Sequence, residues 1–149
     1  GDLFMVRDIG NQIATATGSV QYGVNHLNSS LLLIIGHSKC GAIAAASGDY
    51  SRLEAPIKKE LDTLKIAKGV ENIDGVKTNV NDQVAQALAL FGDKVKAGHL
   101  LILGGVYDFA DDMKQGAGKL NIINVNGETD AARIAAALSS TAVNKHSTH

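Results

Sequence analysis

Residues 31–35 form an uninterrupted apolar run that ends directly at a turn with the sequence Gly-His-Ser-Lys-Cys-Gly. A short run that is apolar at every position is typical of a strand covered on both faces of a parallel sheet, so we expect a central, buried strand here. The turn after it carries His37 and the only cysteine of the chain, Cys40. Ligands of open α/β sheets bind beyond the carboxyl ends of the strands, so this turn is the first place to look for a site.

His37 and Cys40 are predicted to bind zinc. A neutral imidazole and a thiolate both suit Zn²⁺, and a catalytic zinc site combines three protein ligands with one open position. The spacing alone leaves open a structural alternative, in which His37 is hydrogen-bonded scaffolding and Cys40 is a small buried hydrophobe. Gly36 and Gly41 flank these residues and are predicted to let the backbone approach the metal site, and Gly41 is also a candidate substrate-binding residue. The remaining histidines are expected to be structural or solvated; they lie at positions 26, 99, 146 and 149.

The rest of the chain alternates between apolar runs and helix-patterned stretches. Strands are predicted at residues 3–6, 31–35, 99–106 and 120–125. Helices are predicted at residues 17–27, 40–46, 52–68, 79–91 and 129–138, with a surface loop at 70–77 where Gly, Asn and Asp gather. This alternation indicates an α/β fold with a mainly parallel central sheet flanked by helices.

Composition limits the class of protein without naming its chemistry. A length of 149 residues and a hydrophobic content of 45% fit one domain, predicted to span residues 1–138 and to be followed by a polar tail at 139–149. A net charge of −1 gives no electrostatic reason to expect nucleic acid or an anionic membrane as a partner. A single cysteine cannot form an internal disulfide, and no run of 18 apolar residues is present, which favours a cytoplasmic location.

Several segments, in order, resemble the β-class carbonic anhydrases. The stretch 36–42, Gly-His-Ser-Lys-Cys-Gly-Ala, resembles the family's zinc-binding turn, and the stretch 1–11 resembles its Gly-Asp-Leu-Phe-Val-Val-Arg-Asn-Ala-Gly-Asn strand. Residues 20–27 are similar to the following helix, and Asn79-Val80 to a pair that opens a later helix. The stretch 104–108, Gly-Gly-Val-Tyr-Asp, resembles the Gly-x-x-Tyr-Asp end of a later strand. The resemblance spans roughly residues 1 to 128.

The resemblance implies a zinc-dependent enzyme that hydrates CO₂ reversibly to bicarbonate and a proton, working as a homodimer or a larger even-numbered assembly. A bound zinc ion lowers the pKa of water from about 15.7 towards 7, which provides the nucleophile for CO₂. In the family, a Cys-x-Asp-x-Arg segment upstream of the Gly-Asp-Leu-Phe strand supplies the third zinc ligand and an Asp/Arg dyad, and its counterpart would precede Gly1. Two alternatives remain open: a noncatalytic binding or assembly protein of the same fold, and a hydrolase of CS₂ or COS.

Asp8 departs from the family pattern, which usually has Asn at this position. Asp commonly caps turns through neighbouring backbone groups, so a loop cap or an ion pair with Arg7 is one explanation of Asp8. The other is catalytic: the carboxylate would partly replace the acidic residue of the dyad, either as a zinc ligand or as an acceptor for water on the metal. Asp8 is therefore a candidate catalytic residue.

Overall fold

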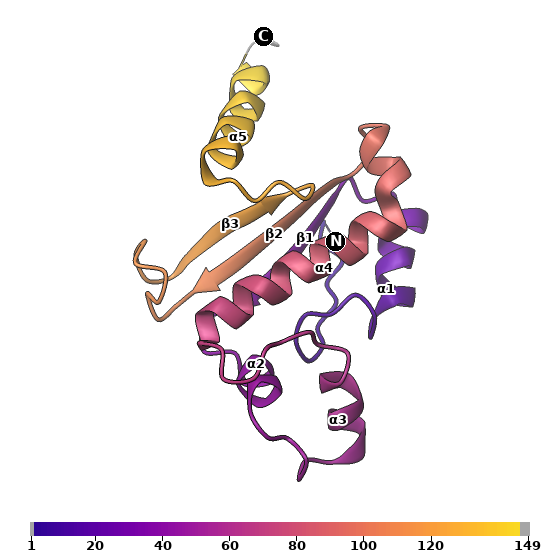
Figure 1. The fold of residues 1–149 in the computed structure, drawn as a ribbon. Coiled ribbons are helices and arrows are strands. Elements are labelled where there is room, and N and C mark those ends of the chain that lie inside the picture. The colour runs from indigo at the N-terminus through magenta and orange to yellow at the C-terminus, as the bar shows by residue number, and fades with distance from the viewer. Residues whose placement is uncertain (1, 147–149) are drawn as a thin grey trace.

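The computed structural model describes the backbone of residues 2–146 and the side chains of residues 2–140. Its centre is a three-stranded mixed sheet in the order β1-β2-β3 (Figure 1). Strand β1 (Leu31–His37) pairs in parallel with β2 (Leu101–Asp108), and β2 pairs antiparallel with β3 (Lys119–Val125). The α/β class is thus confirmed. The central position predicted for the run at 31–35 is wrong, because β2 is the middle strand and β1 lies at the edge of the described sheet.

Six helical elements accompany this sheet in the described part of the chain. The longest, α4, crosses one sheet face in Figure 1, and α2 lies close to its N-terminal end. A kink with nonhelical backbone angles interrupts α4 at Phe91. The elements are α1 (Thr17–Gln21), continued by a π-helix η1 (Tyr22–His26), α2 (Gly41–Ser47), α3 (Ala55–Leu61), α4 (Asn72–Lys96) and α5 (Ala131–His146). No helix in this part of the chain has both the length and the apolar character needed to cross a bilayer.

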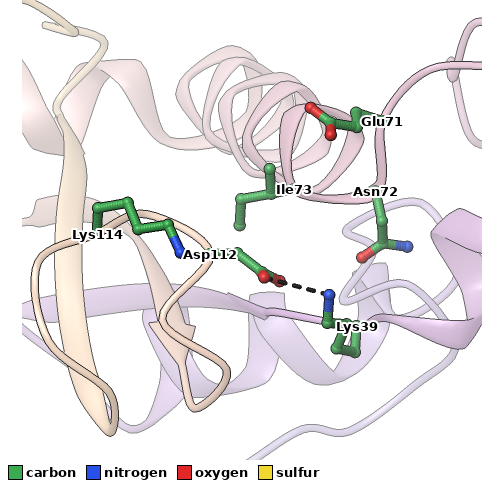
Figure 2. A pocket seen from close by; sticks show the side chains of 6 residues that line it. All are labelled: Lys39, Glu71, Asn72, Ile73, Asp112 and Lys114. Carbon is green, nitrogen blue, oxygen red and sulfur yellow. Dashed lines mark ion pairs between the residues drawn. The ribbon is translucent and has the colours of Figure 1, made fainter.

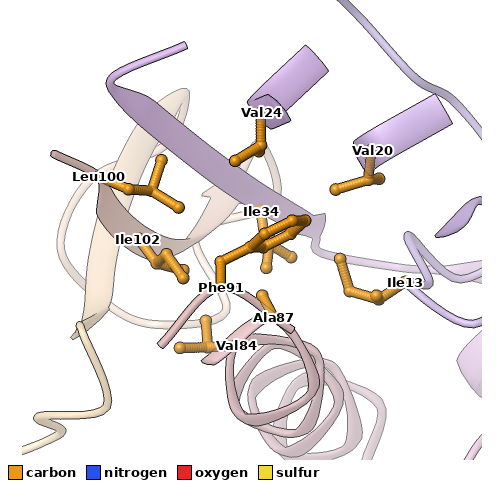
Figure 3. Packing of buried hydrophobic residues seen from close by; sticks show 9 residues of the cluster. All are labelled: Ile13, Val20, Val24, Ile34, Val84, Ala87, Phe91, Leu100 and Ile102. Atoms are coloured by element: carbon orange, nitrogen blue, oxygen red, sulfur yellow. The ribbon is translucent and has the colours of Figure 1, made fainter. Parts of the chain in front are cut away.

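The sheet face beneath α4 is closed. Ile34 of β1 is 5% exposed and Ile102 of β2 is fully buried, and both pack against apolar side chains of α4 and of the α1–η1 segment (Figure 3). Gly36 permits this close packing, because a Cβ there would lie 2.8 Å from a methyl group of Val80. The cluster comprises Ile13, Val20, Val24, Ile34, Val84, Ala87, Phe91, Leu100 and Ile102.

The opposite sheet face is open. Side chains alternate between the two faces of a strand, so the neighbours of the buried positions point away from α4. Ile35, Tyr107 and Leu120 are 43%, 43% and 42% exposed. Tyr107 is the register partner of both His37 on β1 and Leu120 on β3, which places these three side chains at one end of the open face. The predicted candidate ligand His37 therefore belongs to this face.

The helix predicted at 52–68 is shorter in the structure, where α3 covers only Ala55–Leu61. Tertiary hydrogen bonds explain its early end, because side chains take the carbonyl oxygen of Glu60. That oxygen accepts from Gln12 Nε2 at 2.9 Å and from Thr63 Oγ1 at 2.6 Å. The apolar spacing that predicted a longer helix instead reflects Leu64, which is buried and contacts the loop near Gly10.

The surface loop predicted at 70–77 is also wrong, because α4 begins at Asn72. Gly75, taken from the sequence as a loop residue, is buried in the helix, where a Cβ would lie 2.6 Å from a methyl group of Ile43. The glycine thus serves close packing of α4 against α2 rather than a turn. Because α4 begins at Asn72, Asn79 does not open a helix but lies inside one.

The two ends of the chain differ from the predictions as well. The strand predicted at residues 3–6 does not form, and Leu3 and Met5 are 82% and 71% exposed. A strand needs a hydrogen-bonding neighbour, and the structure pairs this segment with none among the described residues; its Phe4 ring packs against Tyr22, with 6.0 Å between the ring centroids, and beside Gly23. At the other end α5 continues past residue 138 to His146, so most of the predicted polar tail is helical; residues 147–149 lie outside the described residues.

Candidate metal centre

The predicted zinc-binding turn joins β1 to α2. Strand β1 ends at His37, and Ser38 and Lys39 form the turn after it. Lys39 has a φ of 55°, which is the left-handed conformation common in tight turns. Cys40 is the N-cap residue of α2, and Gly41 is its first residue. The turn therefore delivers both candidate ligands at the carboxyl end of a strand, as the sequence predicted.

A backbone carbonyl holds one nitrogen of the His37 ring. Nδ1 lies 2.8 Å from the carbonyl oxygen of Ser38, and a carbonyl can only accept, so this contact assigns the proton to Nδ1. The lone pair is then on Nε2, the usual arrangement of a zinc-binding imidazole whose second nitrogen is held by a backbone carbonyl. The ring is exposed and has Phe109 beside it, with centroids 6.3 Å apart.

Cys40 has the opposite environment. It is 6% exposed and belongs to an apolar cluster that includes Ile43 and Val80. The side chain of Asn72, the first residue of α4, makes two hydrogen bonds with the Cys40 backbone. Asn72 Oδ1 accepts from the Cys40 N–H at 3.2 Å, and Asn72 Nδ2 donates to the Cys40 carbonyl at 3.0 Å. Sequence reasoning assigned Asn72 to a loop and missed this role, which only the long-range placement of α4 makes visible.

The turn therefore brings the two candidate ligands together in the chain but gives them different surroundings. An imidazole with a free Nε2 and a nearby thiol fit the donor chemistry of zinc. No group of three or more His, Cys, Asp or Glu side chains able to hold a metal occurs among the described residues. Gly41, the predicted substrate contact, is exposed, and nothing lies within 4 Å of where its Cβ would stand.

Two polar residues, Ser38 in the turn and Asp108 at the end of β2, are fully buried. Burial by itself would raise the pKa of Asp108, but hydrogen bonds outweigh it and hold the pKa below the ordinary value. The Met113 N–H donates to the carboxylate at 2.7 Å and the Asp112 N–H at 3.0 Å, and the Ser38 hydroxyl and the Ala110 N–H also lower the pKa. Neither residue was predicted from the sequence to be functional. The feature that could have identified them is a polar residue at the carboxyl end of each of two adjacent strands.

Asp8 lies in the loop before α1, and both of its carboxylate oxygens have protein partners. Oδ1 accepts from the Gln12 N–H at 2.9 Å, and Oδ2 accepts from the Thr15 hydroxyl. These contacts are those of a loop cap, and the partners of the carboxylate are Gln12 and Thr15 rather than the predicted Arg7. The catalytic role predicted for Asp8 remains a proposal.

The same loop is fastened to α4 by buried amides. Asn79 Nδ2 donates to the Gly10 carbonyl at 2.7 Å, and Gln83 Oε1 accepts from the Ile13 N–H at 2.8 Å. Gln83 Nε2 also donates to Asn79 Oδ1 at 3.0 Å, which joins the two anchors. Asn11, between them, has a φ of 44° and a buried Nδ2 that lacks a hydrogen-bond partner among the described residues. The loop that carries Asp8 is therefore positioned by the long helix.

A cavity of about 310 Å³ opens beside the turn (Figure 2). Lys39 reaches across it to Asp112, with 3.2 Å between Nζ and Oδ1. The other lining residues are Glu71, Asn72, Ile73 and Lys114. Neither His37 nor Cys40 lines this cavity, so it adjoins the candidate metal centre without containing its donors.

Comparison with known proteins identifies the family. The model of the carbonic anhydrase family matches residues 1–116, which include the turn, Ser38 and Asp108. The chain belongs to the β-carbonic anhydrase family. Carbonic anhydrase 2 of Mycobacterium tuberculosis is 30% identical, over 74% of this chain and 60% of the relative. β-Carbonic anhydrase 5 of Arabidopsis thaliana, a chloroplast protein, is 28% identical, over 74% of this chain and 44% of its own length. This chain thus spans less than two thirds of these relatives.

Solved structures of the family share the fold. A tetrameric β-carbonic anhydrase from the ascomycete Sordaria macrospora superposes with a TM-score of 0.66 at 21% identity, covering 80% of this chain and 67% of that one. The Coccomyxa β-carbonic anhydrase in complex with acetazolamide gives a TM-score of 0.64 at 20% identity, covering 98% of this chain and 73% of that one. The predicted β-carbonic-anhydrase-like fold is therefore confirmed.

Proposed function

We propose that this chain carries the zinc-binding turn of an enzyme that hydrates CO₂ reversibly to bicarbonate and a proton. One observation carries the proposal: at the end of β1 the His37 imidazole is held through Nδ1, so that Nε2 is free, three residues before the only cysteine. Membership of the carbonic anhydrase family supports the reaction, and the donor chemistry of the turn supports the metal.

His37 and Cys40 are the residues that would hold the zinc ion. Zinc, when bound, supplies a Lewis acid that makes water a nucleophile near neutral pH. The Ser38 carbonyl fixes the His37 ring, and the Asn72 side chain fixes the Cys40 backbone, so the chain orients both donors before any metal arrives. The proposal places the third ligand outside the described residues, and Gly41 remains the proposed backbone contact of the substrate.

We further propose a homodimer or a larger even-numbered assembly that works in the cytoplasm. The open sheet face supports this assembly, because it carries exposed apolar side chains next to His37 and would leave the reacting centre in bulk water. A second subunit over this face would exclude that water. The tetrameric relative from Sordaria macrospora is consistent with an even number of subunits.

A noncatalytic binding or assembly protein is the second candidate. The observation in its favour is the lack of a three-ligand group among the described residues, since two ligands do not make a catalytic zinc site. The two candidates differ in what they predict for metal content. A catalyst carries about one zinc ion per chain, whereas a binding module has no need for any.

The deciding experiment measures zinc per chain and the rate of CO₂ hydration on the purified protein and on three variants. Cys40→Ser and His37→Ala should each lose most of the zinc and the activity, since a hydroxyl that rarely ionises is a poor replacement for a thiolate. His99→Ala removes an exposed histidine elsewhere and should retain both. Removing the metal from the parent should also lower its thermal stability. Full zinc occupancy in both ligand variants would refute the assignment.

A further inference from the structure

Ser38 and Asp108 lie at the ends of the two parallel strands, in positions that no solvent reaches. Both are 0% exposed, and Ser38 follows the last residue of β1 while Asp108 is the last residue of β2. A fully buried carboxylate is rare in proteins unless it is hydrogen-bonded, and here each of its two oxygens accepts from a backbone N–H of the following loop. The proposed zinc chemistry assigns no task to this carboxylate.

The hydrogen bonds of this pair join the metal-binding turn to the loop that follows β2. Ser38 Oγ accepts from the Ala110 N–H at 3.3 Å, and the Ser38 hydroxyl is among the groups that hold the pKa of the Asp108 carboxyl below its ordinary value. The Ser38 N–H donates to the Tyr107 carbonyl at 3.0 Å. Asp108 in turn accepts from the N–H groups of Asp112 and Met113 and so shapes the loop. Ser38 therefore makes two hydrogen bonds to one neighbouring segment, one through its backbone N–H and one through its side-chain oxygen.

This placement matters because Ser38 sits between the two candidate ligands. Its carbonyl accepts a hydrogen bond from His37 Nδ1, and its side-chain oxygen accepts one from Ala110 in the loop after β2. Any rotation of the Ser38 peptide would move the partner that orients the His37 ring, and it would also shift the chain leading to Cys40. The buried bonds of Ser38 thus act on both ligands at once.

We propose that Ser38 and Asp108 are positioning residues that lock the His37–Cys40 turn to the loop after β2. The lock fixes the His37 ring and keeps the Cys40 thiol buried before a metal is present. Its effect on zinc affinity rests on the proposed zinc-binding function, but its effect on the turn does not. The exposed ion pair between Lys39 and Asp112 joins the same two segments, but solvent screening makes it a weak link.

The single cysteine allows a direct test without metal. In the zinc-free protein, the alkylation rate of Cys40 reports how often the turn opens, because Cys40 is 6% exposed in the closed state. Ser38→Ala should raise this rate about tenfold, since it removes the acceptor of the part-buried Ala110 N–H and the hydroxyl that helps to stabilise the buried Asp108 carboxylate. Asp108→Asn should act in the same direction, because its amide places a donor where only acceptors fit.

Two control variants separate positioning from general destabilisation. Asp112→Asn breaks only the exposed ion pair on the same loop, and it should change the rate by less than about twofold. Asn124→Ala removes a buried side chain on β3 that donates to Asn81 and accepts from the Gly127 N–H, away from the turn. This variant should lose global stability and leave Cys40 alkylation under native conditions near the parent rate.

Ser38→Ala decides the proposal even if Asp108→Asn fails to fold. A folded Ser38→Ala protein with the parent rate would overturn it, and so would an equal rise in Asn124→Ala at equal loss of stability. Zinc affinity, measured by competition with a chelator, should fall about ten- to a hundredfold in Ser38→Ala and remain unchanged in Asp112→Asn. If the parent binds no zinc, the proposed function fails, while the alkylation rates still decide the positioning role.

Discussion

The two faces of the sheet differ in how completely the chain covers them. Beneath α4, Ile102 and Val106 are fully buried, whereas Ile35 and Leu120 on the opposite face are more than 40% exposed. Burial of apolar area is the main source of stability, so the closed face should carry the folding energy of the domain. The open face contributes little to the stability of a single chain, and it would contribute more only if another surface covered it.

The candidate metal centre lies at the border between these faces. Cys40 packs into the closed side, and His37 points to the open side next to Tyr107. One ligand is therefore placed by the core, and the other is placed by hydrogen bonds at an edge. A site of this kind is only half buried by its own chain, so the proposed assembly would complete its burial.

The largest expected effect is on the stability supplied by the closed face. Ile102→Ala should lower the free energy of unfolding by about 2–5 kcal/mol, because it leaves a cavity at a fully buried position. Leu120→Ala, on the open face, should cost less than about 1 kcal/mol. Urea unfolding at low protein concentration measures both. Similar losses in the two variants would mean that the open face is covered within one chain.

The next effect concerns self-association through the open face. Ile35→Lys places a charge on this face and should weaken the association of subunits at least about tenfold, with little change in the stability of the monomer. Leu90→Lys is the matched control, because Leu90 is also 43% exposed but lies on α4. Sedimentation at micromolar concentration compares the two. A parent that is monomeric throughout, or equal weakening by both variants, would contradict an interface on this face.

The sequence predicted those parts of the fold that depend on local pattern. The run at 31–35 gave β1, and the Gly-His-Ser-Lys-Cys-Gly turn gave the two ligands at its end. Helix α2 and strand β3 also begin or end within a residue of the prediction. In these segments, apolar periodicity and turn residues agree with the tertiary structure, so a local rule suffices.

The failures occur where a distant contact overrides the local pattern. Gly75 resembles a loop residue until Ile43 is known to pack against it, and α3 ends early where Gln12, 48 residues away, binds the carbonyl oxygen of Glu60. The buried position of Asp108 could not be predicted either, since an Asp at the end of a strand is usually solvated. The first two cases depend on residues far apart in the sequence.

A smaller effect should appear in the acid dependence of stability. Hydrogen bonds lower the pKa of Asp108 from its ordinary value of 3.8, so its charged form is favoured in the folded state. The contribution is fully present above pH 3.8 and is lost as the pH falls through the lower folded pKa. The stability gap between the parent and Asp108→Asn should therefore be widest near neutral pH and shrink in acid. Urea titrations at several pH values test this; a gap that grows in acid would reverse the sign.

The smallest expected effect is that of Asp8→Asn, which decides between a loop cap and a catalytic carboxylate. Asn keeps one acceptor oxygen, so the loop should lose one of the bonds from Gln12 and Thr15 at a cost of about 1 kcal/mol or less. If Asp8 is only a loop cap, as its two partners favour, zinc affinity and the pH profile of hydration should stay within about twofold of the parent. Thr15→Val, which removes one partner but keeps the carboxylate, should match the stability loss. A tenfold change in zinc affinity in Asp8→Asn, absent from Thr15→Val, would instead make Asp8 part of the metal centre.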